Sequence, residues 1–476
     1  MKKVIRVMLA MLMIGMSIAG CGSDSGNEKE TAAEKTTAAA KDEKETEKET
    51  EKDTEDEKDS ESSDDQSWEG KKLVISAYLA DASQVEVRGK YVDTPLAEAF
   101  PGADIEIKMY NDRQSLQTEV AGGGGPDILD LDGPTDVAEF AKADRVLVLD
   151  DYAKQYGWAD LFYDWAYDSC FFQDKLYSLP TSFEGMVMYY NMDVLEENNW
   201  EIPETAEELE VLMQAMQDEG IIPISFGNSN YQGAVDWLYS SFLSCNAGPV
   251  NLKKAIEGDI KFDDPSMVES MNQMVDWWKA GYIGDNASQS ITGEDATAFF
   301  AEGRAGMMMN GTWLSSQLLT VYPDCNWQAE MIPELRDGVG RILPFATGGG
   351  YAINANSKEQ DFAAEVMNYL FTSTDRHYKS IVEANYQPYP IDAFDLQEIK
   401  AMDEKLFSMY EILDEAQKSK QIGYCSWTFF PSLARVYMNE NTDALFLGSL
   451  TVEEYLQKTQ EYIDAAIEAG ETPVIP

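Results

Sequence analysis

Histidine is almost absent from the sequence, because His377 stands alone among 476 residues. A metal site built from several histidines, or a catalytic triad that needs a second histidine, is therefore excluded. Basic residues are also scarce: 36 Lys and Arg face 86 Asp and Glu and leave a formal net charge of −50. Nucleic acids and other anionic surfaces attract positive charge, so neither is an expected partner of this chain.

Familiar catalytic motifs are missing as well, since the sequence contains no GxSxG, no HExxH and no P-loop. A calcium loop is matched in part, by Asp130, Asp132, Gly133 and Glu139. Its first ligand position holds Ile128, which cannot coordinate a cation. We therefore expect a protein that needs no metal and no cofactor. A surface glycosidase stays open as the enzymatic alternative, because it requires only two carboxylates at a set separation.

Long apolar runs are absent after residue 20, which excludes a membrane-spanning helix in the rest of the chain. The one apolar run, residues 7–19, follows Lys2, Lys3 and Arg6. This run is too short to span a membrane and has a basic flank, so it predicts a secretory signal peptide over residues 1–20.

The signal peptide is followed directly by Cys21, within the segment IAGC. This segment resembles the bacterial lipobox, in which the cysteine is diacylated and becomes the new N-terminus after cleavage. The resemblance implies a lipid anchor on Cys21 that holds the protein at the extracellular face of a bacterial cell membrane. An ordinary signal peptide with an incidental cysteine is the alternative interpretation.

The segment after the cysteine is strongly polar. Between residues 22 and 66 there is no aromatic side chain and no aliphatic side chain larger than alanine. Such a segment cannot bury enough apolar surface to offset the entropy lost on ordering. We therefore expect residues 21–67 to form the lipidated cysteine and a disordered acidic tether, with the functional part of the chain beyond it.

The cysteines beyond the tether are isolated from one another in the sequence. Cys170, Cys245, Cys325 and Cys425 form no CxxC pair and have no metal-like spacing. Outside a cell they could form two disulfides, whose pairing the sequence does not decide. Buried free thiols are the other interpretation, because free cysteine packs as a small apolar residue.

The roughly 400 residues after the tether predict more than one domain. β-Branched and aromatic residues predict strands over residues 71–78, 103–110 and 126–131. The segments between them have a helical pattern, so the β-α-β order predicts a mostly parallel sheet. Later helices are expected to begin at Thr205 with Glu208, at Asp264 with Pro265, at Ser357 with Gln360, and at Thr451 with Glu454.

Four segments in a fixed order carry a family resemblance. They are GGGGPDILDL (122–131), LYSLPTSFEGMVMYYNMDVLEENNWEIPETAEEL (176–209), AFFAEGRAGMMMNGTW (298–313) and GGGYAINANSKEQDFAAEVMNYL (348–370). Together they resemble the signature segments of the extracellular solute-binding proteins of ABC importers, family 1, the maltose-binding-protein-like carriers of sugars and oligosaccharides. The resemblance spans nearly all of residues 68–476.

The resemblance implies an α/β, two-lobed periplasmic-binding-protein-like fold with a ligand cleft between lobes joined by hinge crossovers. The N-terminal lobe is then expected to comprise residues 68–181 plus about 350–395, and the C-terminal lobe residues 182–349 plus about 396–476. One crossover is expected near residues 181–185.

The resemblance also implies a function, and because the matched segments belong to carriers and not to hydrolases, it implies that the protein is not an enzyme. The protein is expected to capture a sugar or oligosaccharide by hinge closure and to deliver it to the transmembrane subunits of an ABC permease. We expect a monomer that meets the membrane only through the lipid on Cys21. The alternatives are a carrier of another neutral or cationic solute, such as a peptide or a polyamine, and the surface glycosidase named above.

Two residues are expected to bind the sugar directly. Trp313 follows NGT, a turn and N-cap signal, so its indole is expected at the first turn of a helix, where it can face the cleft. Glu184 lies in an otherwise apolar strand, where a carboxylate either faces water at an edge or lines a cleft. The family places a ligand-stacking tryptophan and a ligand-contacting glutamate at the matching positions, so the resemblance favours ligand binding for both.

Other tryptophans divide between cleft and core. Asp236, Trp237 and Trp427 match positions where the family tends to place cleft residues, with a core position as the alternative. Trp278 lies on the apolar face of a predicted helix and is expected in the core, while Trp277 is expected in the core or at its boundary.

The remaining candidates lie at strand ends and in a glycine run. Tyr78, Asp81 and Asp132 follow predicted strands, and open α/β sheets present ligand residues at the carboxyl ends of their strands. Gly348, Gly349 and Gly350 allow the backbone to approach a ligand or to flex as a second hinge, so they are expected to line the cleft as well.

Overall fold

The computed structural model describes residues 68–77, 88–110, 113–229, 233–384, 387–391 and 396–476. These residues belong to one compact unit, Gln66–Pro476. The expected signal peptide, Cys21, the tether, Tyr78 and Asp81 lie outside the described residues.

The first sheet has the strand order β2-β1-β3-β12-β6. Its strands are β1 (Lys72–Ala77), β2 (Asp104–Met109), β3 (Ile128–Leu131), β6 (Leu179–Pro180) and β12 (Gly350–Ile353). β1 runs parallel to β2 and β3, which confirms the parallel arrangement predicted for the first three strands. β12, more than 200 residues further along the chain, pairs antiparallel with both β3 and β6.

The second sheet has the strand order β13-β11-β7-β9-β8, with β10 paired to β7. Its strands are β7 (Glu184–Asn191), β8 (Ile222–Ser225), β9 (Ala305–Gly311), β10 (Trp327–Glu330), β11 (Leu343–Ala346) and β13 (Ile422–Tyr424). Every residue of β9 is buried, and so is every residue of β7 except its first, Glu184. Strands buried on both faces need apolar side chains throughout, which explains the runs GMVMYY and AGMMM.

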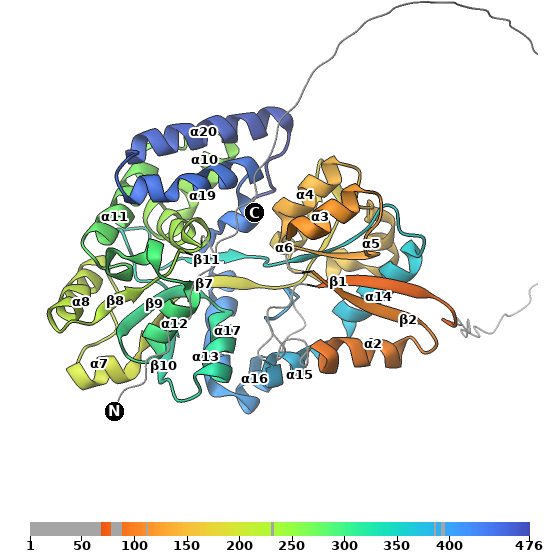
Figure 1. Cartoon of the computed structure of the whole chain (residues 1–476), viewed down its shortest axis with the longest axis horizontal. Helices are drawn as coiled ribbons and strands as arrows, with labels where there is room; N and C mark the ends of the chain where they lie inside the picture. Colours follow the sequence, from red (N-terminus) through yellow and green to blue (C-terminus); the bar gives the residue numbers. More distant parts are fainter. Residues whose placement is uncertain (1–67, 78–87, 111–112, 230–232, 385–386, 392–395) are drawn as a thin grey trace, which may run out of the picture. The chain divides into compact units, whose positions relative to one another are not determined.

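Helices cover both sheets (Figure 1). Those before residue 280 are α2 (Thr94–Ala99), α3 (Arg113–Ala121), α4 (Pro134–Lys142), α5 (Asp150–Tyr156), α6 (Asp164–Asp168), α7 (Met192–Asn198), α8 (Ala206–Asp218), α9 (Ser240–Phe242), α10 (Pro249–Glu257) and α11 (Pro265–Lys279). The later ones are α12 (Gly293–Ala301), α13 (Leu314–Val321), α14 (Gln360–Thr372), α15 (Thr374–Ala384), α16 (Leu396–Met402), α17 (Glu404–Ser419), α18 (Ser426–Phe429), α19 (Ser432–Phe446) and α20 (Val452–Ala469). A π-helix, Ala234–Tyr239, precedes α9, and a short hairpin joins β4 (Phe171–Phe172) to β5 (Lys175–Leu176).

Two of the segments in which the chain passes between the two sheets lie next to each other, and a further passage follows β12 on the way to β13. One of the two adjacent segments joins β6 to β7 and the other joins β11 to β12. The backbone N–H of Thr181 donates to the carbonyl of Gly349 at 3.0 Å, and the N–H of Gly348 donates to Ser182 Oγ at 2.8 Å. These bonds hold the two passages side by side, and Figure 1 shows β7 and β11 running together toward the first sheet.

Two of the predicted capping boxes are present. Thr205 Oγ1 accepts from the N–H of Glu208 at 3.3 Å, and Thr451 Oγ1 accepts from the N–H of Glu454 at 3.1 Å. Each glutamate side chain in turn accepts from the N–H of its threonine, so two otherwise unpaired donors are satisfied at each helix start.

The capping box predicted for Ser357 with Gln360 is wrong. α14 begins only at Gln360, and Ser357 Oγ accepts from the N–H of Glu359 at 3.1 Å instead. The same hydroxyl donates to Asp127 Oδ1 at 2.6 Å, across a sequence distance that no local pattern reveals. The serine therefore shapes a turn before the helix rather than capping it.

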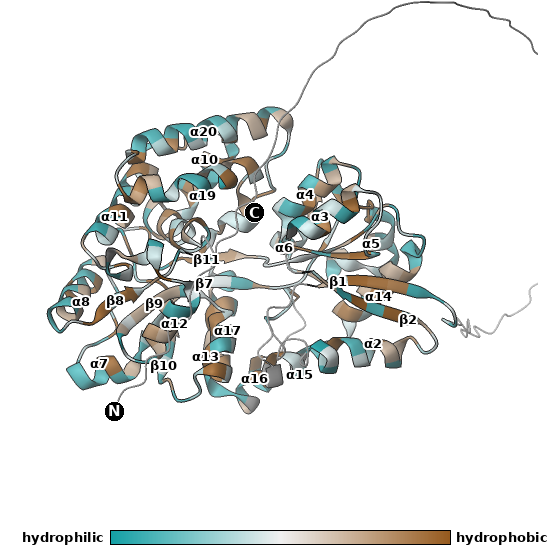
Figure 2. Cartoon of the chain, viewed as in Figure 1, coloured by the Kyte–Doolittle hydropathy of each residue, from teal (hydrophilic) through white to brown (hydrophobic). Residues whose placement is uncertain are grey.

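The structure confirms the positions predicted for two tryptophans in the core. Trp277 and Trp278 are both buried, 3% and 7% exposed, and each indole N–H finds a partner, in Glu210 and Ser288 respectively. Figure 2 shows hydrophobic residues along β1 and an alternation of polar and hydrophobic residues along α20. In the described part of the chain, no helix combines the length and the apolar character needed to cross a membrane.

The cysteines beyond the tether are all buried free thiols: Cys170, Cys245, Cys325 and Cys425. The structure therefore supports the second of the two interpretations that the sequence left open. Burial raises the pKa of Cys170 to about 12 and that of Cys325 to about 11, so both thiols are protonated at neutral pH.

Candidate functional site

A cavity of about 410 Å³ lies where the ends of strands from both sheets meet helices α12, α13, α18 and α19. Its lining combines indole rings, carboxylates and one guanidinium. The lining residues are Asp132, Glu184, Asp236, Trp237, Gly293, Glu294, Thr297, Asn310, Trp313, Leu314, Gln317, Gly348, Trp427 and Arg435. Six of the residues expected at the site, namely Asp132, Glu184, Asp236, Trp237, Trp313 and Trp427, are therefore brought together from five separate parts of the chain.

Three indoles form one wall of this cavity. The ring of Trp313 lies 5.9 Å from that of Trp427, at an interplanar angle of 74°, and 6.2 Å from that of Trp237, at 50°. Trp313 and Trp237 are only partly buried, whereas Trp427 is 8% exposed. Edge-to-face and tilted contacts of this kind fix ring orientation without covering every ring face.

The position of Trp313 follows from the turn between β9 and α13. A Cβ at Gly311 would lie 2.1 Å from the ring of Trp313, so the indole folds back over a residue that must lack a side chain. The N-cap expected within NGT (310–312) is wrong, because the cap position is Trp313 and α13 begins at Leu314. The Thr312 hydroxyl donates instead to Gln387 Oε1 at 2.8 Å.

Glu184 lies at the first position of β7, beside the passage from β11 to β12. Its Oε1 accepts from Ser182 Oγ at 2.9 Å. Burial raises the pKa of the Glu184 carboxyl to about 7, and the charge of nearby Asp132 adds to the rise while the Ser182 bond opposes it. A carboxyl with this pKa exchanges its proton near neutral pH and can donate or accept in the cavity.

Asp132 directly follows β3, at the start of the turn into α4. Its side chain is exposed, and its charge also contributes to raising the pKa of Asp130, which burial brings to about 7. The first sheet therefore supplies a carboxylate to the cavity at the carboxyl end of a parallel strand, as the sequence predicted.

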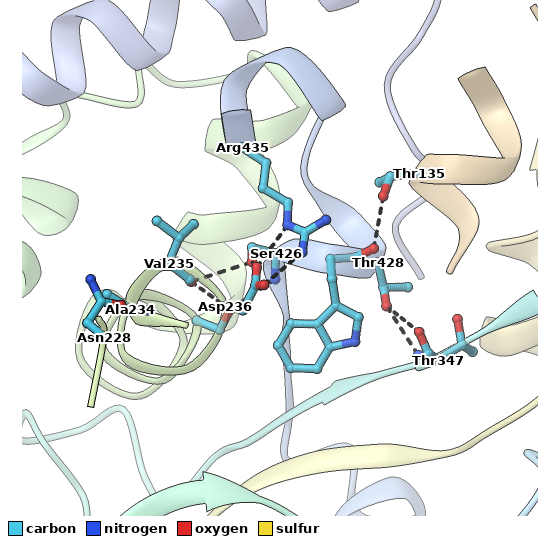
Figure 3. Close-up of polar contacts among 11 residues, drawn as sticks. Thr135, Asn228, Ala234, Val235, Asp236, Thr347, Ser426, Thr428 and Arg435 are labelled. Carbon is cyan, nitrogen blue, oxygen red and sulfur yellow. Dashed lines mark hydrogen bonds and ion pairs between the residues drawn. The ribbon is translucent and has the colours of Figure 1, made fainter. Parts of the chain in front are cut away.

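Asp236 lies in the π-helix and faces Arg435 of α19 (Figure 3). The guanidinium holds both carboxylate oxygens: Arg435 Nε donates to Oδ1 at 2.8 Å and the terminal N–H donates to Oδ2 at 2.7 Å. Ser426 Oγ, next to Trp427, donates to Oδ1 at 2.6 Å. The aspartate is thus engaged by two neighbours, and its arginine partner was not among the residues expected from the sequence.

Gly349 and Gly350 are not among the residues that line the cavity, whereas Gly348 is. A Cβ at Gly349 would lie 2.4 Å from Thr181 Oγ1, and one at Gly350 would lie 3.3 Å from Ser178 Oγ. These two glycines therefore allow the passage from β11 to β12 to pack closely on neighbouring chain. Of the three glycines expected to line the cleft, only Gly348 lines this cavity.

Several lining residues were missed by sequence reasoning. Glu294, Thr297 and Gln317 lie on α12 and α13, and their positions in amphipathic helices look like ordinary solvent-facing ones. Arg435 is separated from Asp236 by 199 residues, so no local pattern marks the pair. Among the residues that the structure describes, no group of three His, Cys, Asp or Glu side chains could hold a metal ion.

Solved structures with this fold are two-lobed solute-binding proteins. A chitin oligosaccharide binding protein superposes with a TM-score of 0.71 at 22% identity, covering 83% of this chain and 99% of that one. Maltose-bound MalE3 of T. maritima gives a TM-score of 0.67 at 20% identity, covering 83% of this chain and 99% of that one. The chain therefore has the two-lobed α/β fold that the sequence predicted.

Residues 81–376 match the family model for bacterial extracellular solute-binding proteins, and the chain belongs to this family. It is similar to the maltodextrin-binding protein MdxE of Bacillus subtilis, at 23% identity over 56% of this chain and 61% of that protein. It is also similar to a galactooligosaccharide-binding protein of Bacillus subtilis, at 23% identity over 66% of this chain and 70% of that protein. The chain thus spans less than two thirds of the length of the first of these relatives.

Proposed function

We propose that this protein captures a sugar or oligosaccharide in the cavity and delivers it to an ABC-type permease. The observation that carries the proposal is the wall formed by Trp237, Trp313 and Trp427 in a cavity that the carboxyl of Glu184 also lines. Sugars have apolar C–H faces that stack on indoles and hydroxyls that pair with carboxylates and amides. The names of the relatives, which bind maltodextrin and galactooligosaccharide, support the same class of ligand.

Capture by closure of two lobes is part of the proposal. The N-terminal lobe would comprise residues 68–181 plus about 350–395, and the C-terminal lobe residues 182–349 plus about 396–476. The cavity draws Asp132 from the first sheet and Glu184 from the second, so motion between the sheets changes its width. A few residues between elements suffice to absorb such a hinge motion.

Membrane attachment also belongs to the proposal. A diacylated Cys21 would hold the protein at the extracellular face of the membrane, and residues 22–67 would act as a tether that keeps the monomer near its permease. A tether of this kind raises the effective concentration of the carrier at its partner. The match to a family of extracellular binding proteins supports the location outside the cell.

A cationic solute is the second candidate ligand, and one observation favours it. The cavity contains the carboxyl groups of Asp132, Glu184 and Glu294 in addition to the arginine-paired Asp236. A polyamine could offset this surplus of negative charge. The three indoles can stack on the apolar face of a sugar at least as well as they can bind a cation through cation–π contacts. The carbohydrate therefore remains the proposed ligand.

A melting-shift panel tests the proposal. The panel contains maltotriose, galactobiose, N,N′-diacetylchitobiose, xylobiose and raffinose, with spermidine and trialanine as non-sugar controls. We expect at least one sugar to raise the melting temperature and to be recovered unchanged after incubation. A rise with spermidine or trialanine alone contradicts a sugar carrier, and release of smaller sugars points to a glycosidase instead.

A further inference from the structure

The carboxylate of Asp236 is engaged inside the protein before any ligand arrives. Its side chain is 4% exposed, and both oxygens lie within 2.8 Å of nitrogen atoms of Arg435. A bidentate pairing of this kind restricts the guanidinium to one plane and one direction. Both residues line the cavity, but the carboxylate of Asp236 is the more deeply covered of the two.

Arg435 is the more accessible partner of the pair, because its side chain is 15% exposed and it lines the cavity. A guanidinium has five N–H donors in a fixed fork, so it can bind more than one acceptor at the same time. The indole of Trp427 lines the same cavity as Arg435. A sugar that stacks on this wall therefore shares the cavity with the arginine.

Ser426 extends the arrangement to the aromatic wall. Its hydroxyl donates to Asp236 Oδ1 at 2.6 Å, and its N–H donates to Ser240 Oγ at 2.9 Å. Trp427 is the next residue of α18. The bond between Ser426 and Asp236 therefore also holds the backbone from which the Trp427 indole projects. One buried carboxylate thus holds the π-helix, α18 and α19 together at the cavity.

We propose that Arg435 binds the ligand directly and that Asp236 is a positioning residue that aims it. The inference rests on the proposed function, because it names a further contact in the same cavity. Asp236 balances the charge of the guanidinium and Asp132, Glu184 and Glu294 add negative charge, so the arginine donates to hydroxyl or ring oxygens of a neutral sugar rather than to a carboxylate.

The test is a double-mutant cycle measured by isothermal titration calorimetry, with the panel sugar that gives the largest melting shift. Arg435→Lys keeps the charge but cannot bridge both oxygens, and Asp236→Asn removes the partner that aims it. Each variant is expected to weaken binding about tenfold or more. The double variant is expected to be little weaker than either single one, because both remove the same contact.

Controls separate this inference from the proposed function. Arg336→Gln removes an arginine that pairs with Glu269 at 3.6 Å outside the cavity, and it should leave affinity unchanged. Trp313→Ala removes an indole that lines the cavity, so it tests whether the cavity is where the sugar binds. If Trp313→Ala weakens binding while the Arg435 and Asp236 variants do not, the inference fails and the proposed function stands. If none of the three affects binding, the cavity is not the site and both fail.

Ser426→Ala provides a milder variant should Asp236→Asn fail to fold. It removes one bond to the aspartate and keeps the ion pair, so binding is expected to weaken a few-fold in a folded protein. Additive losses from Ser426→Ala and Arg435→Lys would overturn the positioning role, since independent contacts add and members of one network do not.

Discussion

The carboxyl group of Glu184 occupies the space beside Gly348, where any other residue would carry its side chain. A Cβ at Gly348 would lie 1.8 Å from Oε1 of Glu184 and 2.2 Å from its carboxyl carbon. The glycine therefore holds a place for the glutamate at the point where the chain crosses from one sheet to the other. The need for a residue without a side chain at Gly348, between β11 and β12, is thus linked to the Glu184 side chain that lines the cavity.

Gly348→Ala should displace the Glu184 carboxyl. The added methyl has no room, so we expect a loss of stability of about 1–3 kcal/mol and a clear weakening of sugar binding. Gly89→Ala is the matched control, because a Cβ there meets nothing within 4 Å. Melting curves and calorimetry check both effects. Unchanged affinity in Gly348→Ala would show that the glutamate has no part in binding.

The raised pKa of Glu184, about 7 against an ordinary value of 4.5, makes stability depend on pH. The folded state binds the Glu184 proton more tightly than the unfolded state does. The contribution of this proton to the stability of the folded state is therefore complete below about pH 4.5 and is lost as the pH rises through 7. Glu184→Gln should therefore gain stability relative to the wild type between pH 5 and pH 8, on the order of 1–3 kcal/mol. Parallel melting profiles of the two proteins would contradict this pKa.

The titration of Glu184 should also make the affinity for the sugar depend on pH. If the ionised Glu184 accepts from sugar hydroxyls, the wild-type affinity should increase from pH 6 to pH 8. The reason is that a growing fraction of the ligand-free protein already has Glu184 ionised, so binding no longer has to remove its proton. Glu184→Gln should bind more weakly and without this pH dependence. Calorimetry at three pH values checks the slope, and an equal slope in both proteins would assign the effect to another group.

His377 should make the fold sensitive to acid. It is 2% exposed, its ring stacks on Tyr389 at 3.6 Å, and its Nε2 accepts from the N–H of Tyr389 at 2.9 Å. Burial, with the charge of Arg376, holds the pKa of the imidazole well below its ordinary 6.5. The folded protein therefore keeps His377 neutral, and stability is lost as the pH falls below about 6.5.

His377→Gln offers an acceptor that does not titrate. It should be less stable than the wild type at pH 8 and should lose less stability on acidification, by up to about 1.4 kcal/mol per pH unit below 6.5. Urea unfolding at pH 5, 6 and 8 measures the difference. A wild-type protein no more acid-sensitive than the variant would show that the buried histidine takes up a proton without cost.

Thr135 joins α4 to the aromatic wall, since its Oγ1 donates to the backbone carbonyl of Trp427 at 3.0 Å. Thr135→Val keeps the shape and removes the donor, so we expect sugar affinity to fall roughly three- to tenfold. Thr118→Val, which loses only a bond to Gln114 within α3, is the control. Equal affinity in both variants would show that this contact does not support the bound state.

How much the sequence revealed depends on whether the signal is local. The β1 to β3 strands, the capping boxes at Thr205 and Thr451, and Trp313 at a strand-to-helix turn follow from short patterns, and the structure has them. Arg435 could not be found in this way, because its meaning depends on Asp236, 199 residues away. Ser357 was misread for the same reason, since its hydroxyl is drawn to Asp127, 230 residues away.

The candidate site was predictable where a residue type conflicts with its surroundings. A carboxylate in the apolar strand β7 and a tryptophan after a turn both need a reason, and both line the cavity. The glycine run shows the limit of this reasoning. All three glycines suit a close approach, but only the positions of Glu184 and Thr181 decide that Gly348 meets the cavity while Gly349 packs against the chain.

The most direct test of the account compares melting curves with and without the sugar found in the panel, for wild type, Trp313→Ala and Trp277→Ala. Trp313 is partly exposed in the cavity, so its loss should change the ligand-free melting temperature little and should abolish most of the ligand-induced rise. Trp277 is buried in the core, so its loss should cost about 3–5 kcal/mol while the ligand-induced rise persists. If Trp313→Ala instead lowers the ligand-free melting temperature and keeps the full ligand-induced rise, the aromatic wall is not the sugar site.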